Sequence, residues 1–81
     1  MTTPSDLLHR LYEMRGAHDY RDVAERAAAP TFVVRRALTD AVAAGLVAER
    51  RDGDRVVFEL TVAGEDLVRE QRGLPALARA A

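Results

Sequence analysis

The chain has 81 residues, no cysteine and a formal net charge of -1; 48% of its residues are hydrophobic and 31% are charged. This length and composition exclude a disordered or multidomain protein and predict one globular domain over residues 1–81. The absence of cysteine excludes disulfides, thiolate metal sites and cysteine nucleophiles. No segment approaches the ~20 apolar residues that span a bilayer, so we expect a cytoplasmic protein without membrane contact.

All 12 basic residues are arginine, a usage that GC-rich bacterial codons produce. The charge balance is not the strongly basic one of a general nucleic-acid coat protein, so any contact with DNA would depend on where individual arginines lie. The apolar residues are mostly Leu, Val and Ala. This predicts a thin core that dimerisation would help to stabilise.

Three helices are expected in the first half of the chain. The first covers about Asp6–Arg15, with Ser5 as its N-cap and Gly16 as its stop. The second is short, about Tyr20–Ala28, and follows the N-cap Asp19. Helical spacing makes these residues of the two helices inward-facing: Leu7, Leu8, Leu11, Tyr12, Met14, Val23, Ala24 and Ala27.

The third helix opens at Pro30 or Thr31, because proline is tolerated in a first turn, and it runs until Gly45. Its inward face is formed by Val34, Leu38, Ala41 and Val42. This helix has the clearest apolar pattern in the chain. Gly45 offers the left-handed backbone that turns the helix into the strand that follows.

Two short strands come next, Leu46–Arg51 and Arg55–Leu60, joined by Asp52-Gly53-Asp54. Their alternation predicts a hairpin with five apolar side chains on one face: Leu46, Ala48, Val56, Phe58 and Leu60. An isolated two-stranded hairpin is only marginally stable, so this face should pack against the first and third helices.

A last helix is expected from Val62 to about Arg72, capped by Thr61, with Leu67 and Val68 inward and Gly73 at its end. Gly64 would permit close approach to a neighbouring segment. Residues 73–81 then form a tail or a helical extension of a core over about residues 5–72. The element order predicts an α+β fold, mostly α: a winged helix-turn-helix with three helices, a two-stranded β-hairpin wing and a C-terminal helix.

Several short motifs occur in order along this plan: Val34-Arg35-Arg36-Ala37-Leu38, Ala44-Gly45-Leu46-Val47, Arg50-Arg51, and Phe58-Glu59-Leu60-Thr61 with Gly64. Together they resemble the winged-helix transcriptional regulators of the MarR and PadR type, over about Tyr20–Arg72. The resemblance implies a small, single-domain bacterial regulator of transcription that binds double-stranded DNA, with a homodimer as its working form. In those families extra terminal helices form the dimer interface, and here only Met1–Arg15 and Leu74–Ala81 are available for that role.

In a helix-turn-helix, the second helix of the motif enters the major groove with its N-terminal residues on base edges. The corresponding residues here are Thr31, Phe32, Val33, Arg35 and Arg36. Arginine suits bidentate contact with guanine, and an apolar side chain can pack on a thymine methyl. The alternative is that the two arginines form a solvated helix face while Phe32 and Val33 are partly buried.

The wing carries Arg50, Arg51 and Arg55 around its tip, where they could reach phosphates or the minor groove. Thr31–Glu59 nevertheless holds five arginines and five acids, so binding should be modest and sensitive to salt. The alternative is a soluble hairpin whose charges compensate one another. At the start of the second helix, Tyr20 and Arg21 are candidate phosphate contacts; the alternative for Tyr20, which we favour for that residue, is that it closes the core between the first two helices.

The two histidines, His9 and His18, lack the spacing of a metal site, and no nucleophile or phosphate-loop motif is present, so we expect neither an enzyme nor a cofactor. A small-molecule effector is not expected, because little chain is available to build a cleft. The predicted function is a DNA-binding transcriptional regulator. The alternative is a winged helix that binds another protein without DNA, motivated by the neutral hairpin and the apolar pair Phe32 and Val33.

Overall fold

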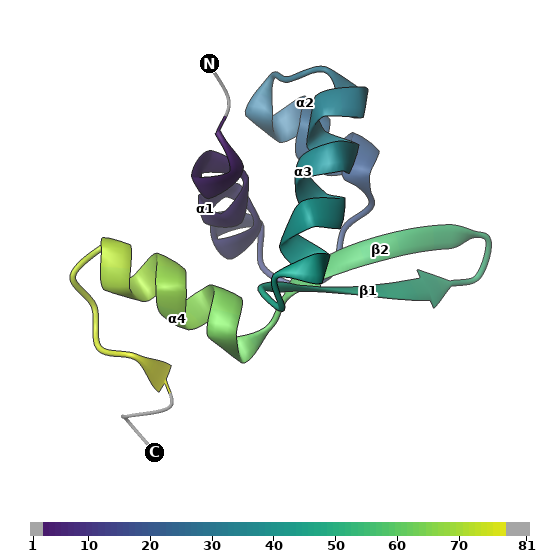
Figure 1. Cartoon of the computed structure of the whole chain (residues 1–81). Helices are drawn as coiled ribbons and strands as arrows, with labels where there is room; N and C mark the ends of the chain where they lie inside the picture. The colour runs from purple at the N-terminus through teal and green to yellow at the C-terminus, as the bar shows by residue number, and fades with distance from the viewer. Residues whose placement is uncertain (1–2, 78–81) are drawn as a thin grey trace.

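The computed structural model describes residues 3–77, which form four helices and one two-stranded antiparallel sheet (Figure 1). In chain order the elements are α1 (Pro4–Met14), α2 (Tyr20–Ala27), α3 (Thr31–Ala43), β1 (Val47–Asp52), β2 (Arg55–Leu60) and α4 (Val62–Gln71). This order confirms the predicted winged helix-turn-helix. Within residues 3–77, no helix has the length and apolarity needed to cross a membrane.

The start of α1 differs from the prediction, because Thr3 and not Ser5 is its N-cap. The Thr3 hydroxyl accepts from the Asp6 backbone N–H at 3.2 Å, and the Asp6 carboxylate accepts from the Thr3 backbone N–H at 3.0 Å. Such a reciprocal pair satisfies two backbone donors that a helix start leaves open. Pro4, whose ring suits the first position of a helix, follows the cap.

The predicted caps of α2 and α4 are confirmed. Asp19 accepts from the Asp22 backbone N–H at 2.9 Å, and Thr61 accepts from the Gly64 backbone N–H at 3.1 Å. At the other end of α3 the chain leaves the helix through Gly45, whose φ of +78° lies in the left-handed region. Local sequence signals therefore account for where these helices begin and where α3 turns into the wing.

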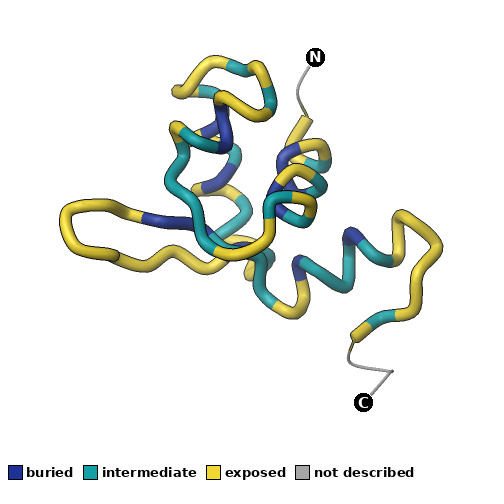
Figure 2. The backbone as a smooth tube through the Cα atoms, turned by 180° about the vertical axis from the view of Figure 1, so that it is seen from behind, coloured by how far each residue is buried: buried dark blue, intermediate teal, exposed yellow. Residues whose placement is uncertain are grey.

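The core lies where the first three helices meet the root of the hairpin and one face of α4. Figure 2 shows buried stretches on the inner sides of the helices and an exposed hairpin tip. The buried cluster comprises Leu7, Leu8, Leu11, Val23, Ala24, Val34, Leu38, Val47, Phe58 and Val68. Most of these residues are those that helical spacing predicts to face inward.

The facing of β1 was predicted wrongly. Val47 pairs with Leu60, so Val47, and not Ala48, shares a face with Phe58 and Leu60. Leu46 packs against the core from the turn before the strand, where its backbone N–H donates to Ala41 at 3.0 Å. Because the strand begins one residue later than predicted, its alternation is inverted and Ala48 is exposed.

The hairpin also differs at its tip and at its root. Asp52 pairs with Arg55, so the connection is the two residues Gly53 and Asp54 instead of three. Val56, predicted to face inward, is 37% exposed near the tip, whereas the next residue, Val57, on the opposite face of the strand, is only 5% exposed. At the root, His18 exchanges two backbone hydrogen bonds with Phe58, at 2.9 and 2.7 Å, a short third pairing that the sequence did not predict.

The passage from β2 into α4 is held against the turn that precedes β1. The Thr61 backbone N–H donates to the Leu46 carbonyl at 3.1 Å, and the Thr61 hydroxyl donates to the Gly45 carbonyl at 2.7 Å. A Cβ atom at Gly64 would overlap the Leu46 carbonyl oxygen and lie 3.1 Å from the Leu60 side chain. This confirms that Gly64 serves close approach.

After α4 the chain turns at Gly73, whose φ is +75°, and folds back along the helix. The Arg69 guanidinium donates to the Pro75 carbonyl at 2.7 Å, and the Leu77 backbone N–H donates to the Asp66 carboxylate at 2.6 Å. The predicted tail or helical extension over residues 73–81 lies partly outside the described residues, because they end at Leu77.

The close approach at Gly64 gives the first testable prediction. Gly64→Ala should lower the free energy of unfolding by about 1–2 kcal/mol, because a steric cost toward the upper end of about 1–3 kcal/mol exceeds the gain of about 0.5–1 kcal/mol from replacing a helical glycine. Urea denaturation followed by circular dichroism measures this change. The control Ala63→Ser, at an exposed neighbouring position, should stay within about 0.5 kcal/mol of wild type. Equal stability of the two variants would contradict the proposed overlap.

Candidate nucleic-acid interface

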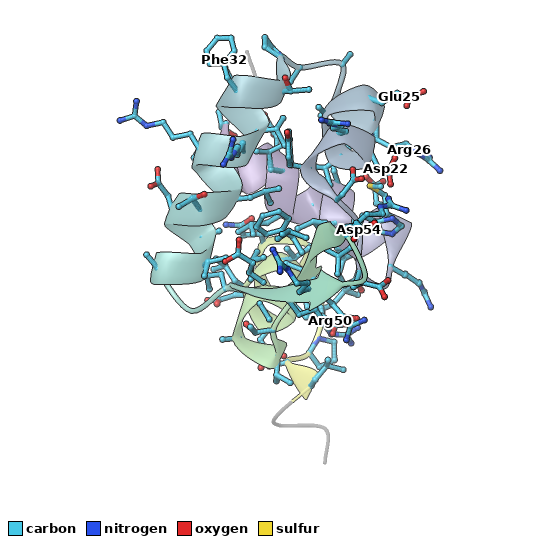
Figure 3. All side chains as sticks on the ribbon, turned by 90° about the vertical axis from the view of Figure 1, so that its right-hand side faces the viewer. Asp22, Glu25, Arg26, Phe32, Arg50 and Asp54 are labelled. Atoms are coloured by element: carbon cyan, nitrogen blue, oxygen red, sulfur yellow. The ribbon has the colours of Figure 1, made fainter. Side chains whose placement is uncertain are left out.

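The first turns of α3 expose most of the residues predicted to read bases. Phe32 is 75% exposed at the outer end of the helix (Figure 3), and Thr31, Arg35 and Arg36 are exposed as well. Val33 is half-buried. Val34, which follows Val33, is fully buried. One face of α3 therefore packs in the core, while the opposite face is exposed and can contact a partner.

The ion pairs divide the predicted arginines into two groups. Within residues 3–77, carboxylates lie within 4.0 Å of Arg10, Arg50, Arg55 and Arg72. Four of the predicted site arginines have no such partner among the described residues, and we call them the open arginines: Arg21, Arg35, Arg36 and Arg51. They come from α2, α3 and β1, and their charges remain available to an anion.

Arg50 on β1 is only weakly engaged. Its guanidinium lies 3.9 Å from the Glu59 carboxylate, and the two side chains are 65% and 43% exposed. An exposed pair of this kind contributes little to stability and is screened by salt. Figure 3 shows Arg50 and Asp54 on the right of the hairpin, below Asp22 of α2, whereas α3 lies on the left of the view. Arg50 can therefore exchange Glu59 for a phosphate at small cost.

Arg55 lies at the wing tip, but its guanidinium is bound by two carboxylates at the start of α2. Its guanidinium donates to the Asp19 carboxylate at 2.9 Å and to the Asp22 carboxylate at 3.2 Å, both at the start of α2. This contact connects β2 to the helix-turn-helix and fixes the direction of the wing. The sequence did not predict this contact, since Arg55 lies 36 positions from Asp19 and 33 positions from Asp22. One signal was available: because Asp19 already caps α2, the second carboxylate, Asp22, was free to bind a cation.

The charge states of this contact follow from its hydrogen bonds. The pKa of Asp19 is lowered mainly by the hydrogen bond from the Asp22 backbone N–H, with a further contribution from Arg55, and partial burial opposes both. The pKa of Arg55 is raised by its hydrogen bond to Asp19 and by the charge of that carboxylate. Asp19 therefore serves as N-cap of α2 and as anchor for the wing.

Tyr20 is half-buried and packs against the core, as the structural interpretation of this residue predicts. Its ring also faces two of the open arginines. The guanidinium carbons of Arg21 and Arg35 lie 5.8 and 5.7 Å from the ring centre, within the range of cation–π interaction. Tyr20 thus links the start of α2 to the exposed face of α3.

The histidines make local hydrogen bonds. His18 contacts the Arg15 carbonyl at 2.6 Å, and His9 contacts the Gln71 side chain at 2.7 Å. In the part of the chain that the structure describes, no group of three or more His, Cys, Asp or Glu residues could hold a metal ion.

The Asp19–Arg55 contact predicts a specific pH dependence. Because the folded pKa of Asp19 is lowered, the stability that its charge provides is complete above the unfolded pKa of about 3.9 and is lost as pH falls through the folded value. Asp19→Asn keeps a capping oxygen but removes this charge. Its urea midpoint should lie below that of wild type at pH 7, and the difference should close below about pH 4. A difference that stays constant down to pH 3 would rule out this role of the charge.

Solved structures supply the comparison, because no protein-family model and no curated protein matches the sequence. The chain is similar to a candidate DNA-binding protein from Ralstonia eutropha, with 30% identity and a TM-score of 0.73, over 84% of this chain and 91% of that one. It is similar to BpsR of Bordetella bronchiseptica, with 27% identity and a TM-score of 0.79, over 90% of this chain and 54% of that one. The DNA binding of BpsR is regulated by 6-hydroxynicotinic acid.

The transcriptional regulator PcaV from Streptomyces coelicolor shares the fold, with a TM-score of 0.77 and 23% identity over 98% of this chain and 57% of that one. The chain thus spans little more than half the length of BpsR and PcaV. These proteins are regulators and not enzymes, in agreement with the prediction for this chain. The three structures do not test the predicted resemblance to regulators of the PadR type. The winged-helix fold and the 30% identity over 91% of the Ralstonia protein show that the chain belongs to the same winged-helix family as that DNA-binding protein, and its fold is similar to that of the MarR-type regulators BpsR and PcaV.

Proposed function

We propose that this chain binds double-stranded DNA as a transcriptional regulator, with α3 in the major groove and the wing on the backbone or in the minor groove. The observation that carries this proposal is the set of open arginines on α2, α3 and β1 in a domain whose net charge is -1. Arginines that lack local carboxylate partners favour an external anion, and a DNA backbone supplies a row of them.

The exposed face of α3 fits the major groove. Arg36 can contact guanine through two hydrogen bonds, Thr31 can donate or accept, and Phe32 can pack on a thymine methyl. Because Val34 and Leu38 hold the opposite face in the core, the helix presents these side chains from a rigid support. Substitutions on the exposed face should therefore change binding without unfolding the domain.

The wing is proposed to contact DNA through Arg50 and Arg51. Paired residues of an antiparallel hairpin lie on one face, so the pairing of Arg50 with Val57 and of Arg51 with Val56 directs the two arginines to opposite faces. One of them can then meet the backbone while the other reaches toward the groove. In this proposal Arg55 acts indirectly, by holding the hairpin against α2.

We further propose a homodimer in the bacterial cytoplasm. One domain of this size offers few base contacts, and a two-fold dimer on a palindromic site doubles them without new chemistry. The exposed apolar residues Val62, Leu74 and Leu77, on and just after α4, are available for such contact. The dimer also agrees with the thin core that the composition predicts.

The comparisons weigh against the expectation that no effector takes part, since BpsR is regulated by a small aromatic acid and PcaV was solved with its natural ligand. We propose that a small aromatic acid modulates this chain as well. A cavity of about 360 Å³ is lined by residues of α1, β2 and α4, among them Tyr12, Arg15 and Arg69. The ring of Tyr12 and the two guanidinium groups can bind an aromatic carboxylate, although Glu59 and Glu65 line the same cavity and oppose its negative charge.

A specific observation keeps the protein-binding alternative open. Phe32, 75% exposed at the end of α3, is a large apolar side chain of the kind that anchors protein interfaces. If the domain binds a protein instead of DNA, Phe32→Asp should abolish that binding, and the open arginines should have no effect. The DNA-binding experiment therefore distinguishes the two proposals.

The experiment measures the electrophoretic mobility of duplex genomic fragments with wild-type protein at low and near-physiological salt. We expect selective retention that weakens as salt rises. The double variant Arg36→Ala/Arg51→Ala should lose at least about tenfold in affinity, because it removes one base contact and one backbone contact. The matched control Arg10→Ala, on α1, should bind as wild type does. Failure of wild type to retain any fragment at low salt would overturn the proposal.

The effector proposal has its own test. Addition of 6-hydroxynicotinic acid to the complex of wild type and DNA should change its affinity at least about tenfold, within the usual range of allosteric coupling. Arg15→Ala should reduce that response while leaving DNA affinity unchanged, since Arg15 lines the cavity between α1 and α4. Isothermal titration without DNA measures binding of the acid directly. Absence of binding by this compound and by related aromatic acids would refute the effector proposal but not DNA binding.

A further inference from the structure

We infer that Tyr20 is a positioning residue that holds Arg35 and Arg21 for the DNA backbone, so that Arg35 contacts phosphate and base recognition depends on Arg36. This inference rests on the proposed function and refines it, because sequence analysis assigned Arg35 and Arg36 together to base edges. It divides two adjacent arginines into one that determines affinity and one that determines sequence preference.

The position of Tyr20 is fixed by packing. It is the first residue of α2, directly after the N-cap Asp19, and its half-buried ring packs against the core. A ring held in this way can orient the side chains that lie over it. The guanidinium carbons of Arg21 and Arg35 lie 5.8 and 5.7 Å from its centre. One ring therefore gathers two arginines that come from different helices.

The two charges gathered on Tyr20 repel each other, and the nearby acids do not compensate them. Asp19 and Asp22, the carboxylates that flank Tyr20 in sequence, both accept hydrogen bonds from Arg55. No carboxylate of the described residues lies within 4.0 Å of Arg21 or Arg35. A phosphate oxygen bound by both guanidinium groups would relieve this repulsion.

The fold determines which part of DNA these arginines would meet. In a helix-turn-helix the first helix of the motif crosses the backbone while the second enters the groove. Tyr20 lies on α2, the first of these helices, and it draws Arg35 from α3 toward α2. Arg36 follows Arg35 by about 100° around the helix and is not among the arginines over Tyr20 in the described structure. Arg36 therefore remains directed toward base edges.

The test compares two duplexes by fluorescence anisotropy: one selected by wild-type protein from a random pool, and one with the same bases scrambled. Arg35→Ala should weaken binding to both duplexes by the same factor and reduce the slope of log affinity against log salt by about 0.9, the loss of one phosphate contact. Arg36→Ala should instead reduce the preference for the selected duplex by about 5- to 150-fold.

Tyr20 is tested through the same slope. Tyr20→Phe retains the ring and should match wild type, whereas Tyr20→Leu should reduce the slope as Arg35→Ala does. The double variant Tyr20→Leu/Arg35→Ala should bind DNA more weakly than Arg35→Ala only by the amount that Arg21 contributes to affinity. The reason is that both changes remove the same phosphate contact of Arg35. Urea denaturation checks that each variant is folded, and Arg35→Ala at its exposed position keeps the test valid if Tyr20→Leu does not fold.

Two outcomes would overturn the inference while leaving DNA binding intact. The first is a loss of sequence preference in Arg35→Ala equal to that in Arg36→Ala, which would assign Arg35 to a base edge. The second is an unchanged salt slope in both Arg35→Ala and Tyr20→Leu. By contrast, wild-type protein that binds neither duplex at low salt would overturn the proposed function itself, and the inference with it.

Discussion

The burial of the hairpin root under the helices is the constraint on which this small structure depends. A two-stranded hairpin is only marginally stable in water, so Val47 and Phe58 must be covered for the wing to exist. The chain achieves this with the paired backbone of His18 on one side and the close approach of α4 at Gly64 on the other. These contacts join the wing to the helices at its root.

A second constraint is the near balance of charge. With 13 acids and 12 arginines, the domain cannot attract DNA through net charge, so the arrangement of ion pairs decides which arginines are available. Arg55 occupies two carboxylates at the start of α2 and at the same time fixes the wing. The open arginines then border the exposed face of α3. One ion-pair cluster thus contributes to both the shape and the electrostatics of the proposed interface.

Helix α3 combines two tasks on opposite faces. Val34 and Leu38 are buried in the core, while Phe32 and the arginines of the same turns face outward. The similarity to BpsR and to the Ralstonia protein agrees with this division, because a DNA-binding protein can vary its exposed contacts without losing its fold. In such an arrangement the packed face preserves the position of the helix, and the open face is free to differ between proteins.

The sequence by itself determined the helices, their order and most of the core, because helical spacing, the caps Asp19 and Thr61 and the turn at Gly45 act over a few residues. It also contained the Thr3–Asp6 spacing that starts α1, a signal that the choice of Ser5 overlooked. Only the tertiary structure decided the facing of β1, which depends on where α3 releases the chain, and the contacts of Arg55 with α2 and of Arg35 with Tyr20. These contacts join separate segments whose proximity is set by packing of the whole core, and no local pattern encodes that proximity.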